Sequence, residues 1–406
     1  MNGKGSNLTI VKEKNLRLIR RILYEKSPIS RAEIAQQMEL SLPTITTNVA
    51  RLLSAGILRE LQTDADSSAP GRRPVLLEYT TDFGYFVGVD LSPYMTYIAL
   101  TDLRGNVLAQ DSAPAAEEDY AQMLEHLRAT IDRFIESSTV PRAKILGVGV
   151  CLPGFIEADS GLVRNNRRRD WNNRLFAADL QTLLSLPVRI ENNVRARAIG
   201  CELFQREFDA DPLLYYYVSR GLGCSLILNK EVLYGASAGA GEIGHTIVDP
   251  NGPICDTCGN RGCLDAVASE NAIRKQCRQL MSAGIPTLLT MLCENPEDPT
   301  IEEILKAQAC NDKLVCGVLS DAIGYIGRNI SNLATFVSPR TIVILSRLFM
   351  SEENQAALME IIRTNVFSYA DKHLNVIFLP YHTHSGAIGA AATAVQRFFL
   401  EANDED

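Results

Sequence analysis

Apolar runs long enough to cross a membrane are missing from this sequence. A membrane-spanning helix needs about 18 or more apolar residues in succession, and the 406-residue chain contains no such run. The first ten residues are polar and lack the apolar segment of a secretory signal. Apolar residues make up 46% of the chain and charged residues 22%, which is typical of a globular protein. We therefore expect a cytoplasmic protein without membrane insertion, and the length predicts more than one domain.

An excess of positive charge is also absent, because the formal net charge of the chain is −8. On its own, this balance disfavours a nucleic-acid-binding protein. The charge is unevenly distributed, however: residues 1–78 contain 12 Lys and Arg against 8 Asp and Glu, which leaves a net −12 for the remainder. Positive charge is thus concentrated in the N-terminal segment, where DNA binding would use it.

The N-terminal segment has the pattern of a helix-turn-helix. Apolar residues recur at helical spacing over Lys12–Glu25, which predicts an amphipathic first helix. Ser30 and Glu33 form a capping box that starts a second helix. After a short turn, Ser41 caps a third helix and Gly56 ends it. A short helix, a tight turn and a longer helix in this order are typical of a helix-turn-helix.

The third helix is the predicted recognition helix. Its apolar residues that share one face, and must pack inward, are Ile45, Val49, Leu52 and Leu53. The polar residues are thereby turned outward, where Thr, Asn and Arg side chains suit hydrogen bonding to bases and phosphates in a major groove. The candidate DNA-contacting residues of this segment are Ser41, Thr44, Thr47, Asn48 and Arg51. The alternative is an ordinary solvated helix face.

Two short strands and a basic loop follow, which predicts the wing of a winged helix. Residues 57–62 and 75–79 alternate like paired strands. The loop between them ends at residues 70–74, Pro-Gly-Arg-Arg-Pro, and two adjacent arginines held by Gly and Pro suit a narrow minor groove. We therefore add Arg72 and Arg73 to the candidate DNA contacts. A flexible linker with a basic pair is the alternative.

The remainder of the chain predicts an α/β protein with mixed sheets and two lobes of similar build. Strands are expected at Tyr85–Leu91, Thr96–Asp102, Val107–Ser112, Ile145–Leu152, Leu214–Ser219, Cys224–Leu228, Thr341–Leu345 and Val376–Leu379. Helices are expected over residues 119–138 and 386–400, and the second of these is expected to pack back on the first lobe.

Two segments carry a resemblance to a known family. Residues 239–245, Gly-Ala-Gly-Glu-Ile-Gly-His, and residues 255–265, Cys-Asp-Thr-Cys-Gly-Asn-Arg-Gly-Cys-Leu-Asp, resemble the signature of the ROK family (repressors, open reading frames and kinases). The resemblance covers essentially the whole chain and is greatest to the repressor branch of NagC-like and Mlc-like regulators of sugar uptake. It implies a winged helix-turn-helix followed by the two-lobed, actin-like fold of sugar kinases.

The resemblance sets the expected domains. They are a winged helix-turn-helix domain over residues 1–80, a first lobe over 81–195 with 381–406 packing back on it, and a second lobe over 196–380 that contains the metal motif and oligomerisation helices. The segment Leu314–Phe336 is apolar enough for a subunit interface, although packing within the chain is equally compatible.

A cluster of metal-binding residue types lies within the signature. His245, Cys255, Cys258 and Cys263 offer one imidazole and three thiolates, a set that suits a closed, tetrahedral, structural Zn²⁺ site. The family pattern has one residue between the first two cysteines, and this chain has two. Three reduced cysteines without a metal are the alternative, since a long cytosolic chain disfavours disulfides.

The resemblance also implies that kinase chemistry has been lost. Three turns that would approach the phosphates of a nucleotide are altered: residues 90–94 read Asp-Leu-Ser-Pro-Tyr, residues 221–223 read Gly-Leu-Gly, and Ser346-Arg347 replaces paired glycines. Asn193 stands where the family has its catalytic Asp, and an amide cannot accept the proton of a sugar hydroxyl. We therefore predict a protein that is not an enzyme.

Part of a sugar pocket is expected to remain. By resemblance, the candidate sugar-contacting residues are Asn192, Asn193, Glu242, His245 and Asp265. Residues 167–169 are three arginines in a loop that resembles the family's sugar-covering segment, and they would suit a phosphate on the effector; a solvated loop is the alternative. A decayed pocket that holds no ligand is the other reading.

Together these patterns predict a repressor that binds operator DNA as a homodimer or homotetramer and releases it on binding a sugar or sugar phosphate. Three alternatives remain open: an active sugar kinase with an accessory DNA-binding domain, a regulator controlled by a transport protein, and a DNA-binding protein without an effector. The single tryptophan, Trp171, lies in the expected ligand loop and offers a fluorescent reporter.

Overall fold

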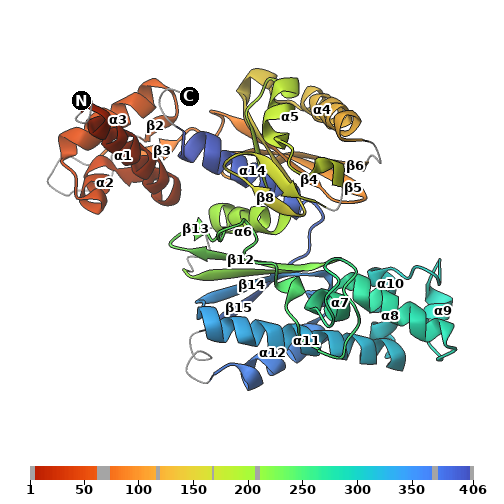
Figure 1. Ribbon diagram of the computed structural model, residues 1–406. Helices are drawn as coiled ribbons and strands as arrows, with labels where there is room; N and C mark the ends of the chain where they lie inside the picture. Colours follow the sequence, from red (N-terminus) through yellow and green to blue (C-terminus); the bar gives the residue numbers. More distant parts are fainter. Residues whose placement is uncertain are drawn as a thin grey trace. The chain divides into compact units, whose positions relative to one another are not determined.

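The structure is a computed structural model that describes residues 5–61, 74–115, 119–166, 169–205, 211–367 and 374–402. The chain forms two compact units (Figure 1): Met1–Glu207 with Gly386–Asp406, and Phe208–Ser385. Arg72 and Arg73 of the predicted wing lie outside the described residues, as do Arg167 and Arg168. Within the described part of the chain, none of the helices has the length and apolar character that crossing a membrane requires.

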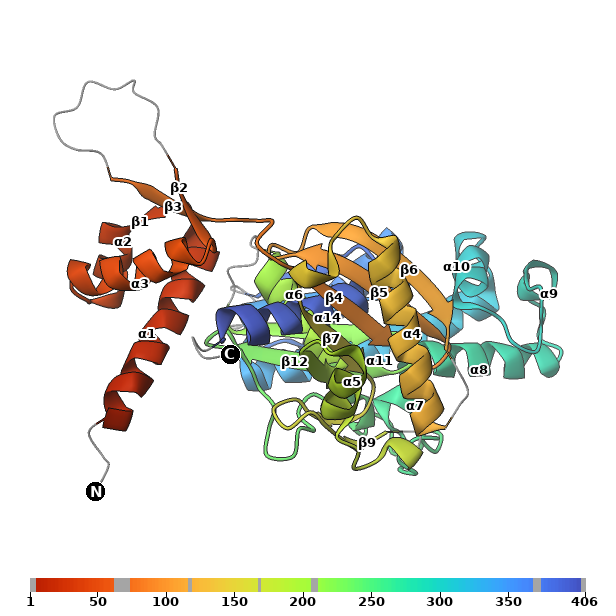
Figure 2. The same ribbon diagram turned by 90° about the horizontal axis from the view of Figure 1, so that it is seen from above.

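The N-terminal part of the first unit folds as the predicted winged helix (Figure 2). Its helices are α1 (Gly5–Lys26), α2 (Arg31–Met38) and α3 (Leu42–Ser54). An antiparallel sheet of order β1-β3-β2 joins β1 (Ile29–Ser30), β2 (Leu58–Leu61) and β3 (Leu76–Tyr79). The sequence does not predict β1, because two residues carry too little periodicity to be recognised.

Local caps set the ends of α2 and α3. The Ser30 side chain accepts a hydrogen bond from the Glu33 backbone N–H at 3.3 Å, and the Glu33 carboxylate accepts one from the Ser30 backbone N–H at 2.9 Å. Ser41 accepts a hydrogen bond from the backbone N–H of Thr44 at 3.4 Å. Gly56 follows the end of α3 with a φ of 73°, a conformation that favours glycine. These caps are the ones that the sequence predicts.

A mixed sheet forms the core of the rest of the first unit. Its order is β10-β7-β4-β5-β6, in which β10, β7 and β4 are parallel, while β5 and β6 continue the sheet in antiparallel pairs. The bounds are β4 (Tyr85–Leu91), β5 (Met95–Asp102), β6 (Val107–Pro114), β7 (Ile145–Leu152) and β10 (Val188–Asn192). A small hairpin of β8 (Phe155–Glu157) and β9 (Leu162–Asn165) follows β7.

Helices cover both faces of this sheet (Figure 1). Valines of β4 and β7 pack into one apolar core with α4 (Tyr120–Ser137) and α5 (Phe176–Leu184). Glycines alternate with these valines and face α14 (Ser385–Val395): a Cβ on Gly88 or Gly149 would lie 1.8 Å from a carbonyl oxygen of α14. The absence of side chains at these two positions therefore lets α14 lie directly on the sheet. A π-helical turn over Gln396–Leu400 continues α14.

Helix α6 (Asn193–Phe204) begins directly after β10 and belongs to the first unit. The boundary expected between the lobes, after residue 195, falls inside this helix. The described chain resumes in the second unit at residue 211 and returns to the first unit at Gly386.

The second unit is built on a sheet of order β13-β12-β11-β14-β15. Its strands are β11 (Leu213–Val218), β12 (Leu222–Leu228), β13 (Glu231–Val232), β14 (Thr341–Leu345) and β15 (Asn375–Leu379). Its helices are α7 (Leu264–Ala268), α8 (Glu270–Ser282), α9 (Leu289–Leu292), α10 (Ile301–Ala309), α11 (Lys313–Val337) and α12 (Glu352–Asn365). Buried residues of β11, β14, α8, α10, α11 and α12 form one apolar core.

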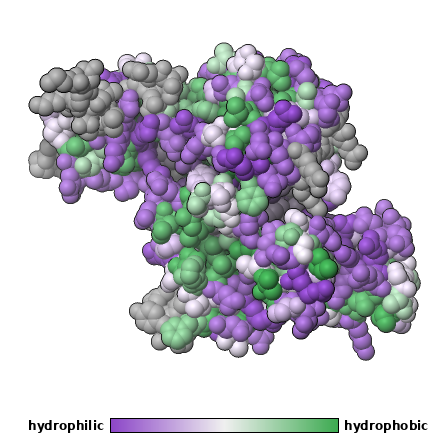
Figure 3. Space-filling model, viewed as in Figure 1, coloured by the Kyte–Doolittle hydropathy of each residue, from purple (hydrophilic) through white to green (hydrophobic). Residues whose placement is uncertain are grey.

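The visible surface is mostly hydrophilic, with apolar residues gathered over part of the second unit (Figure 3). Leu228 and Leu233, at 45% and 49% exposure, flank β13 in this unit. The α/β fold with an N-terminal winged helix-turn-helix agrees with the prediction from sequence.

Candidate functional site

The exposed face of α3 is the candidate DNA-binding surface. Ile45 and Val49 are fully buried and Leu52 is 2% exposed, so the predicted inward face does pack inward. Thr47 and Arg51 are exposed on the same helix. Helix α3 therefore presents polar side chains to solvent from a scaffold that its apolar face fixes in place.

Several of these polar side chains also hydrogen-bond to their own helix. The Thr47 hydroxyl donates to the carbonyl oxygen of Pro43 at 3.0 Å, and the Asn48 amide nitrogen donates to the carbonyl oxygen of Thr44 at 2.8 Å. The Ser41 hydroxyl lies 2.8 Å from the Thr44 hydroxyl. Ser41 is thus engaged in capping α3, while the carbonyl group of the Asn48 amide is the part of that side chain suited to accept a hydrogen bond from a base.

A loop of the second unit brings together the four predicted metal ligands. His245 ends a short 3₁₀ helix (Ile243–His245), and the side-chain ligand atoms of His245, Cys255, Cys258 and Cys263 all lie within 4.8 Å of one another. Isolated bridges pair Ile247 with Cys263 and Ile254 with Arg261, which folds the loop back on itself. Gly262 has a φ of 73°, and a Cβ there would lie 1.6 Å from the carbonyl oxygen of Asp249. The loop conformation thus requires glycine at this position.

The distances within the cluster fit a tetrahedral ion. Cys258 Sγ lies 3.5 Å from Cys263 Sγ, and Cys255 Sγ lies 3.7 Å from His245 Nδ1. A tetrahedral zinc with thiolates at about 2.3 Å would place sulfur atoms about 3.8 Å apart. Hydrogen bonding from the backbone of Asn260 lowers the pKa of Cys258, whereas burial raises the pKa of Cys263 to about 12. The four residues can hold a metal ion, and binding would have to displace the Cys263 proton.

Asn192 and Asn193, the two candidate sugar contacts of the first unit, stand at the start of α6. Asn192 caps the helix: its Oδ1 accepts from the backbone N–H of Val194 at 2.8 Å, and its Nδ2 donates to the carbonyl oxygen of Gly154 at 3.0 Å. Asn192 is 6% exposed, so it holds the β10–α6 turn in place. Asn193 is half-buried, and its carbonyl oxygen accepts a hydrogen bond from Arg197 at 2.8 Å.

Glu242, His245 and Asp265, the other three candidates, belong to the second unit. The Asp265 carboxylate accepts a hydrogen bond from the backbone N–H of Leu222 at 3.0 Å. A Cβ on Gly244 would lie 3.4 Å from the same carboxylate, which places the segment of Glu242 and His245 against Asp265. Asp265 therefore ties the Gly221–Gly223 turn to the metal-binding loop.

A buried ion pair lies at residues 90–94, the first of the three turns that the resemblance relates to nucleotide binding. Asp90, the last acidic residue of β4, accepts a hydrogen bond from Arg197 of α6 at 2.6 Å, and the two side chains are only 4% and 6% exposed. A Cβ on Gly386 would lie 1.9 Å from the Asp90 carboxylate, so α14 closes over the pair. Arg197 was not predicted as a functional residue. The available signal was two arginines, at positions 195 and 197, within a mostly small and apolar helix.

A second ion pair lies at the altered turn after β14. Arg347 contacts the Glu270 carboxylate at 2.9 Å and that of Glu302 at 2.8 Å. Glu270 is 2% exposed, and burial raises the pKa of its carboxyl while Arg347 opposes that change. Each unit thus places an arginine side chain where the family resemblance leads one to expect a nucleotide-binding turn.

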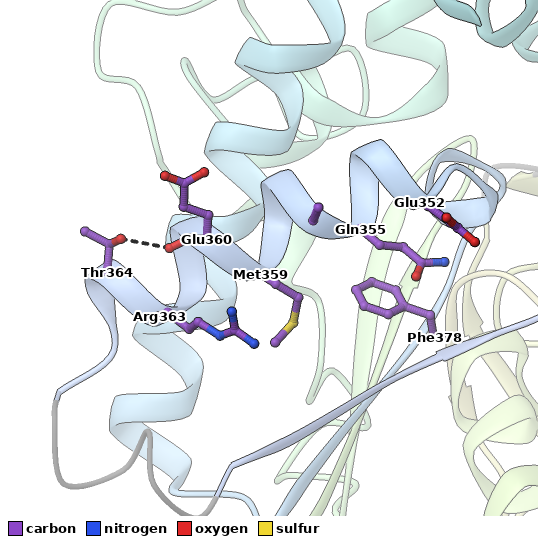
Figure 4. A pocket seen from close by; sticks show the side chains of 8 residues that line it. Glu352, Gln355, Met359, Glu360, Arg363, Thr364 and Phe378 are labelled. Atoms are coloured by element: carbon purple, nitrogen blue, oxygen red, sulfur yellow. Dashed lines mark hydrogen bonds between the residues drawn. The ribbon is translucent and has the colours of Figure 1, made fainter.

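A shallow groove of about 630 Å³ runs along α12 (Figure 4). Gln355, Met359 and Arg363 of α12 line it together with Phe378 of β15, whereas the hydroxyl of Thr364 donates to the carbonyl oxygen of Glu360 at 2.8 Å. None of the residues lining this groove is among the predicted site residues, and most of the polar ones are exposed.

Comparison with known proteins follows the same division of the chain. A winged helix-turn-helix DNA-binding model matches residues 12–59, and a ROK family model matches residues 86–397. The chain is 28% identical over 396 residues to the putative xylose repressor of Caldicellulosiruptor sp. (strain Rt8B.4), covering 96% of this chain and 97% of the relative. It is also 28% identical to the DNA-binding transcriptional dual regulator NagC of Escherichia coli (strain K12), covering 95% and 93% of the two chains.

The fold is shared with a solved regulator. A crystal structure of a ROK family transcriptional regulator, described as a homologue of the E. coli MLC protein, has a TM-score of 0.83, with 26% identity and coverage of 96% of this chain and 98% of that one. The matched family region contains both the His/Cys cluster and the altered turns, and it follows a capped recognition helix. The chain belongs to the ROK family and carries a winged helix-turn-helix DNA-binding domain ahead of the family's two-lobed body.

Proposed function

We propose that this chain is a cytoplasmic, sugar-responsive transcriptional repressor of genes for carbohydrate uptake or catabolism. The proposal depends on two features of one chain: an exposed polar recognition helix, and a ROK body in which arginine ion pairs lie at two of the three altered turns. Relatives that align over nearly their whole length are named as a xylose repressor and as the regulator NagC, and neither is named as a kinase.

Operator binding is assigned to α3 and the wing. Thr44, Thr47 and Asn48 would reach base edges from the major groove, while Arg51 would contact phosphate. Ser41 would act through the helix end that it caps. Arg72 and Arg73 would enter the minor groove. A homodimer or homotetramer would place two such helices on a palindromic operator, as the symmetry of most oligomeric regulators requires.

The effector is proposed to be a sugar or a sugar phosphate. Glu242, His245 and Asp265 lie in segments that hydrogen bonds and close backbone contacts hold together, and they supply the acceptors that sugar hydroxyls need. Asn193 would contribute a side-chain amide, which can both donate hydrogen bonds to sugar hydroxyls and accept them. Asn192 would fix the backbone of this turn, since its side chain is already engaged in the α6 cap.

A structural zinc ion is proposed for His245, Cys255, Cys258 and Cys263. The support is the chemistry of the donors and separations of 3.5 and 3.7 Å that match the edges of a tetrahedron. When bound, the ion would supply cross-linking energy to a loop that has little apolar core of its own. His245 would then link the metal-binding loop to the sugar pocket, because its second ring nitrogen faces away from the metal.

Phosphoryl transfer is not proposed, because Asn193 cannot act as the base. The turn residues of a sugar kinase approach phosphates through backbone N–H groups, and here Pro93 has none. Arg197 and Arg347 add side chains at the same turns.

The decisive experiment uses the full-length chain and a pool of random DNA duplexes. We expect selection to enrich a palindromic sequence, and at least one sugar or sugar phosphate in a broad panel to weaken its binding. The Thr47→Ala and Asn48→Ala variants should lose about 1–3 kcal/mol of binding each if they contact bases. Thr46→Ala is the matched control, because Thr46 is an exposed threonine of the same helix to which no DNA contact is assigned. Like Thr47, it donates its hydroxyl to a carbonyl oxygen of the preceding turn.

Effector binding is tested separately. Glu242→Gln should bind the operator as the parent does but no longer respond to the sugar, whereas Glu231→Gln, an exposed change in the same unit, should respond normally. No enriched sequence would refute the assignment of DNA binding. An operator that no sugar or sugar phosphate releases would refute the sugar response alone.

A further inference from the structure

A cavity of about 250 Å³ lies within the first unit. Its lining includes Trp171, from the expected ligand loop, but none of the five candidate sugar-contacting residues. It is enclosed by the loop after β4, by one side of α4, and by the segments that follow β6, β7 and β9. The volume exceeds the roughly 150 Å³ that holds a benzene molecule in an engineered protein cavity, and it falls below the range of drug-sized pockets. The space therefore suits a molecule with a single ring.

The walls of the cavity are largely apolar. Leu91, Met123, Leu127 and Trp171 contribute aliphatic, thioether and indole surface, and none of the described residues that line the space is Asp, Glu, Lys or Arg. Trp171 is 6% exposed, and its ring packs at 5.9 Å from Phe176 and 6.5 Å from Tyr120. A charged ligand would lose hydration here without gaining a partner of opposite charge, so the occupant should be neutral.

Three polar side chains of the lining already form hydrogen bonds within the chain. The Ser92 hydroxyl donates to Met95 at 2.7 Å, the Thr130 hydroxyl donates to the carbonyl oxygen of His126 at 2.8 Å, and the Asn166 amide donates to Pro153 at 2.7 Å. A sugar, with a hydroxyl on nearly every carbon, would give up more hydrogen bonds with water than these groups can replace. An apolar ring with at most a hydroxyl or two does not incur this cost.

We propose that this cavity binds a small, neutral, aromatic molecule of the phenol or benzyl alcohol class, in addition to the sugar effector. Trp171 supplies an aromatic wall against which the ring of the ligand can pack. Aromatic pairs prefer a distance of about 4.5–7 Å between their ring centroids. Met123 supplies a polarisable thioether. His126, which is exposed and lines the cavity, offers one ring nitrogen to a ligand hydroxyl. The assignment does not depend on sugar binding or on DNA binding.

The cavity borders the Pro153–Gly154 turn, which is hydrogen-bonded to the start of α6. Pro153 lines the cavity, and the next residue, Gly154, accepts a hydrogen bond from Asn192 at the start of α6. A ligand against Pro153 would therefore lie one residue away from the turn that carries Asn193. An aromatic ligand in this cavity can therefore influence the position of Asn193, one of the candidate sugar contacts.

The test titrates the full-length protein with benzyl alcohol and follows the fluorescence of Trp171, the only tryptophan of the chain. Glycerol at equal concentration controls for a solvent effect. We expect a saturable change with benzyl alcohol and none with glycerol. Ala115→Phe, which adds a ring to a half-buried position lining the cavity, should weaken binding at least about tenfold. Ala121→Phe makes the same change at an exposed position of α4 outside the cavity and should leave binding unchanged.

A second measurement keeps the proposal testable if Ala115→Phe fails to fold. In the native sequence labelled with ¹³C at methionine methyl groups, benzyl alcohol should shift the Met123 resonance more than that of the exposed Met291. A change that rises linearly without saturation, equal binding by folded Ala115→Phe, or an unshifted Met123 resonance would overturn the proposal.

Discussion

At the scale of single residues, Asp90 and Arg197 form a buried ion pair inside the first unit. Both side chains are nearly inaccessible, and the pair lies where α6 and α14 meet the end of β4. Removing one partner of a buried ion pair leaves the other charge without compensation, which typically destabilises a protein by about 3–5 kcal/mol.

We therefore expect Arg197→Ala to lower the free energy of unfolding of the first unit by about 3–5 kcal/mol. Urea denaturation followed by Trp171 fluorescence reports on this unit, because Trp171 belongs to its core. Arg189→Ala, which removes a pair with the 99%-exposed Asp159, should cost less than about 1 kcal/mol. Similar losses for the two variants would show that the Asp90 pair contributes no more than a surface contact.

Glu33 provides a residue-scale prediction on pH. Two hydrogen bonds from Ser30 lower the pKa of Glu33 below its usual 4.5. The bond from the Ser30 side chain has the larger effect, and the bond from its backbone has the smaller one. Because the folded-state pKa is lowered, the stability that this carboxylate contributes is complete above the unfolded pKa. That stability is lost as the pH falls through the lowered value.

We expect NMR titration to give Glu33 a pKa below the usual value, and to return it toward 4.5 in Ser30→Ala. Ser54→Ala, which removes a hydroxyl bonded to Arg51 at the other end of the helix-turn-helix, should not change it. An unchanged Glu33 pKa in Ser30→Ala would mean that the capping box does not hold the carboxylate in solution.

Residues with local roles were predictable from sequence, and residues with distant partners were not. The caps at Ser30 and Ser41 depend on contacts three residues away, which a motif records. Arg197 pairs with Asp90 across 107 positions, and nothing in the local pattern names that partner. Asn192 was predicted to contact a sugar, but that assignment remains a prediction; its side chain is seen to hold the α6 turn.

At the scale of elements, contact between α14 and the first-unit sheet depends on glycine. A Cβ on Gly149 would lie 1.8 Å from the Ala390 carbonyl oxygen. Neither atom can turn aside, because the β7 backbone fixes the position of the Cβ and the α14 backbone fixes that of the oxygen. The helix would have to move away from β7 along its whole length, which would open the closely packed layer between them.

Gly149→Ala should therefore destabilise the first unit or prevent its folding, measured by soluble yield and by thermal unfolding followed at Trp171. Gly317→Ala is the matched control, since no atom lies within 4 Å of the added Cβ in α11, and alanine should stabilise that exposed helical position by about 1 kcal/mol or less. A Gly149→Ala protein as stable as its parent would contradict the close packing of α14.

The metal-binding loop gives the second prediction at this scale. If zinc holds residues 245–263 together, the purified chain should contain about one zinc per chain by elemental analysis, a value expected for a closed four-ligand site. Cys258→Ser should lose most of that zinc, whereas Cys310→Ser should keep it, because Cys310 is exposed and outside the cluster. Equal zinc in both variants would remove Cys258 from the ligand set.

Elements with strong local patterns were also predicted best. β4, β7 and β14 have the predicted bounds, since each is a run of apolar, β-forming residues. β10 was missed because charged Arg189 and Glu191 interrupt its five residues, and its identity as a strand depends on parallel pairing with β7. β13 has only two residues, and its pairing with β12 follows from the Asn229-Lys230 turn.

At the scale of the whole molecule, the family resemblance predicted the sugar-kinase fold, which the periodicity of the sequence alone did not. Residue patterns predicted a winged helix and an α/β body, while the two-lobed sugar-kinase fold came from the signature around residues 239–265 and is confirmed by the family and structural matches.

The winged helix contacts the C-terminal turn within the first unit. Arg20 of α1 donates hydrogen bonds to the carbonyl oxygens of Phe399 and Ala402, and the ring of Tyr79 in β3 packs 5.3 Å from that of Phe399. The C-terminal turn, as far as Ala402, therefore lies against the DNA-binding domain. Fusions at this terminus should be avoided in operator assays, and screens of truncated libraries should find repression lost when the final turn is removed.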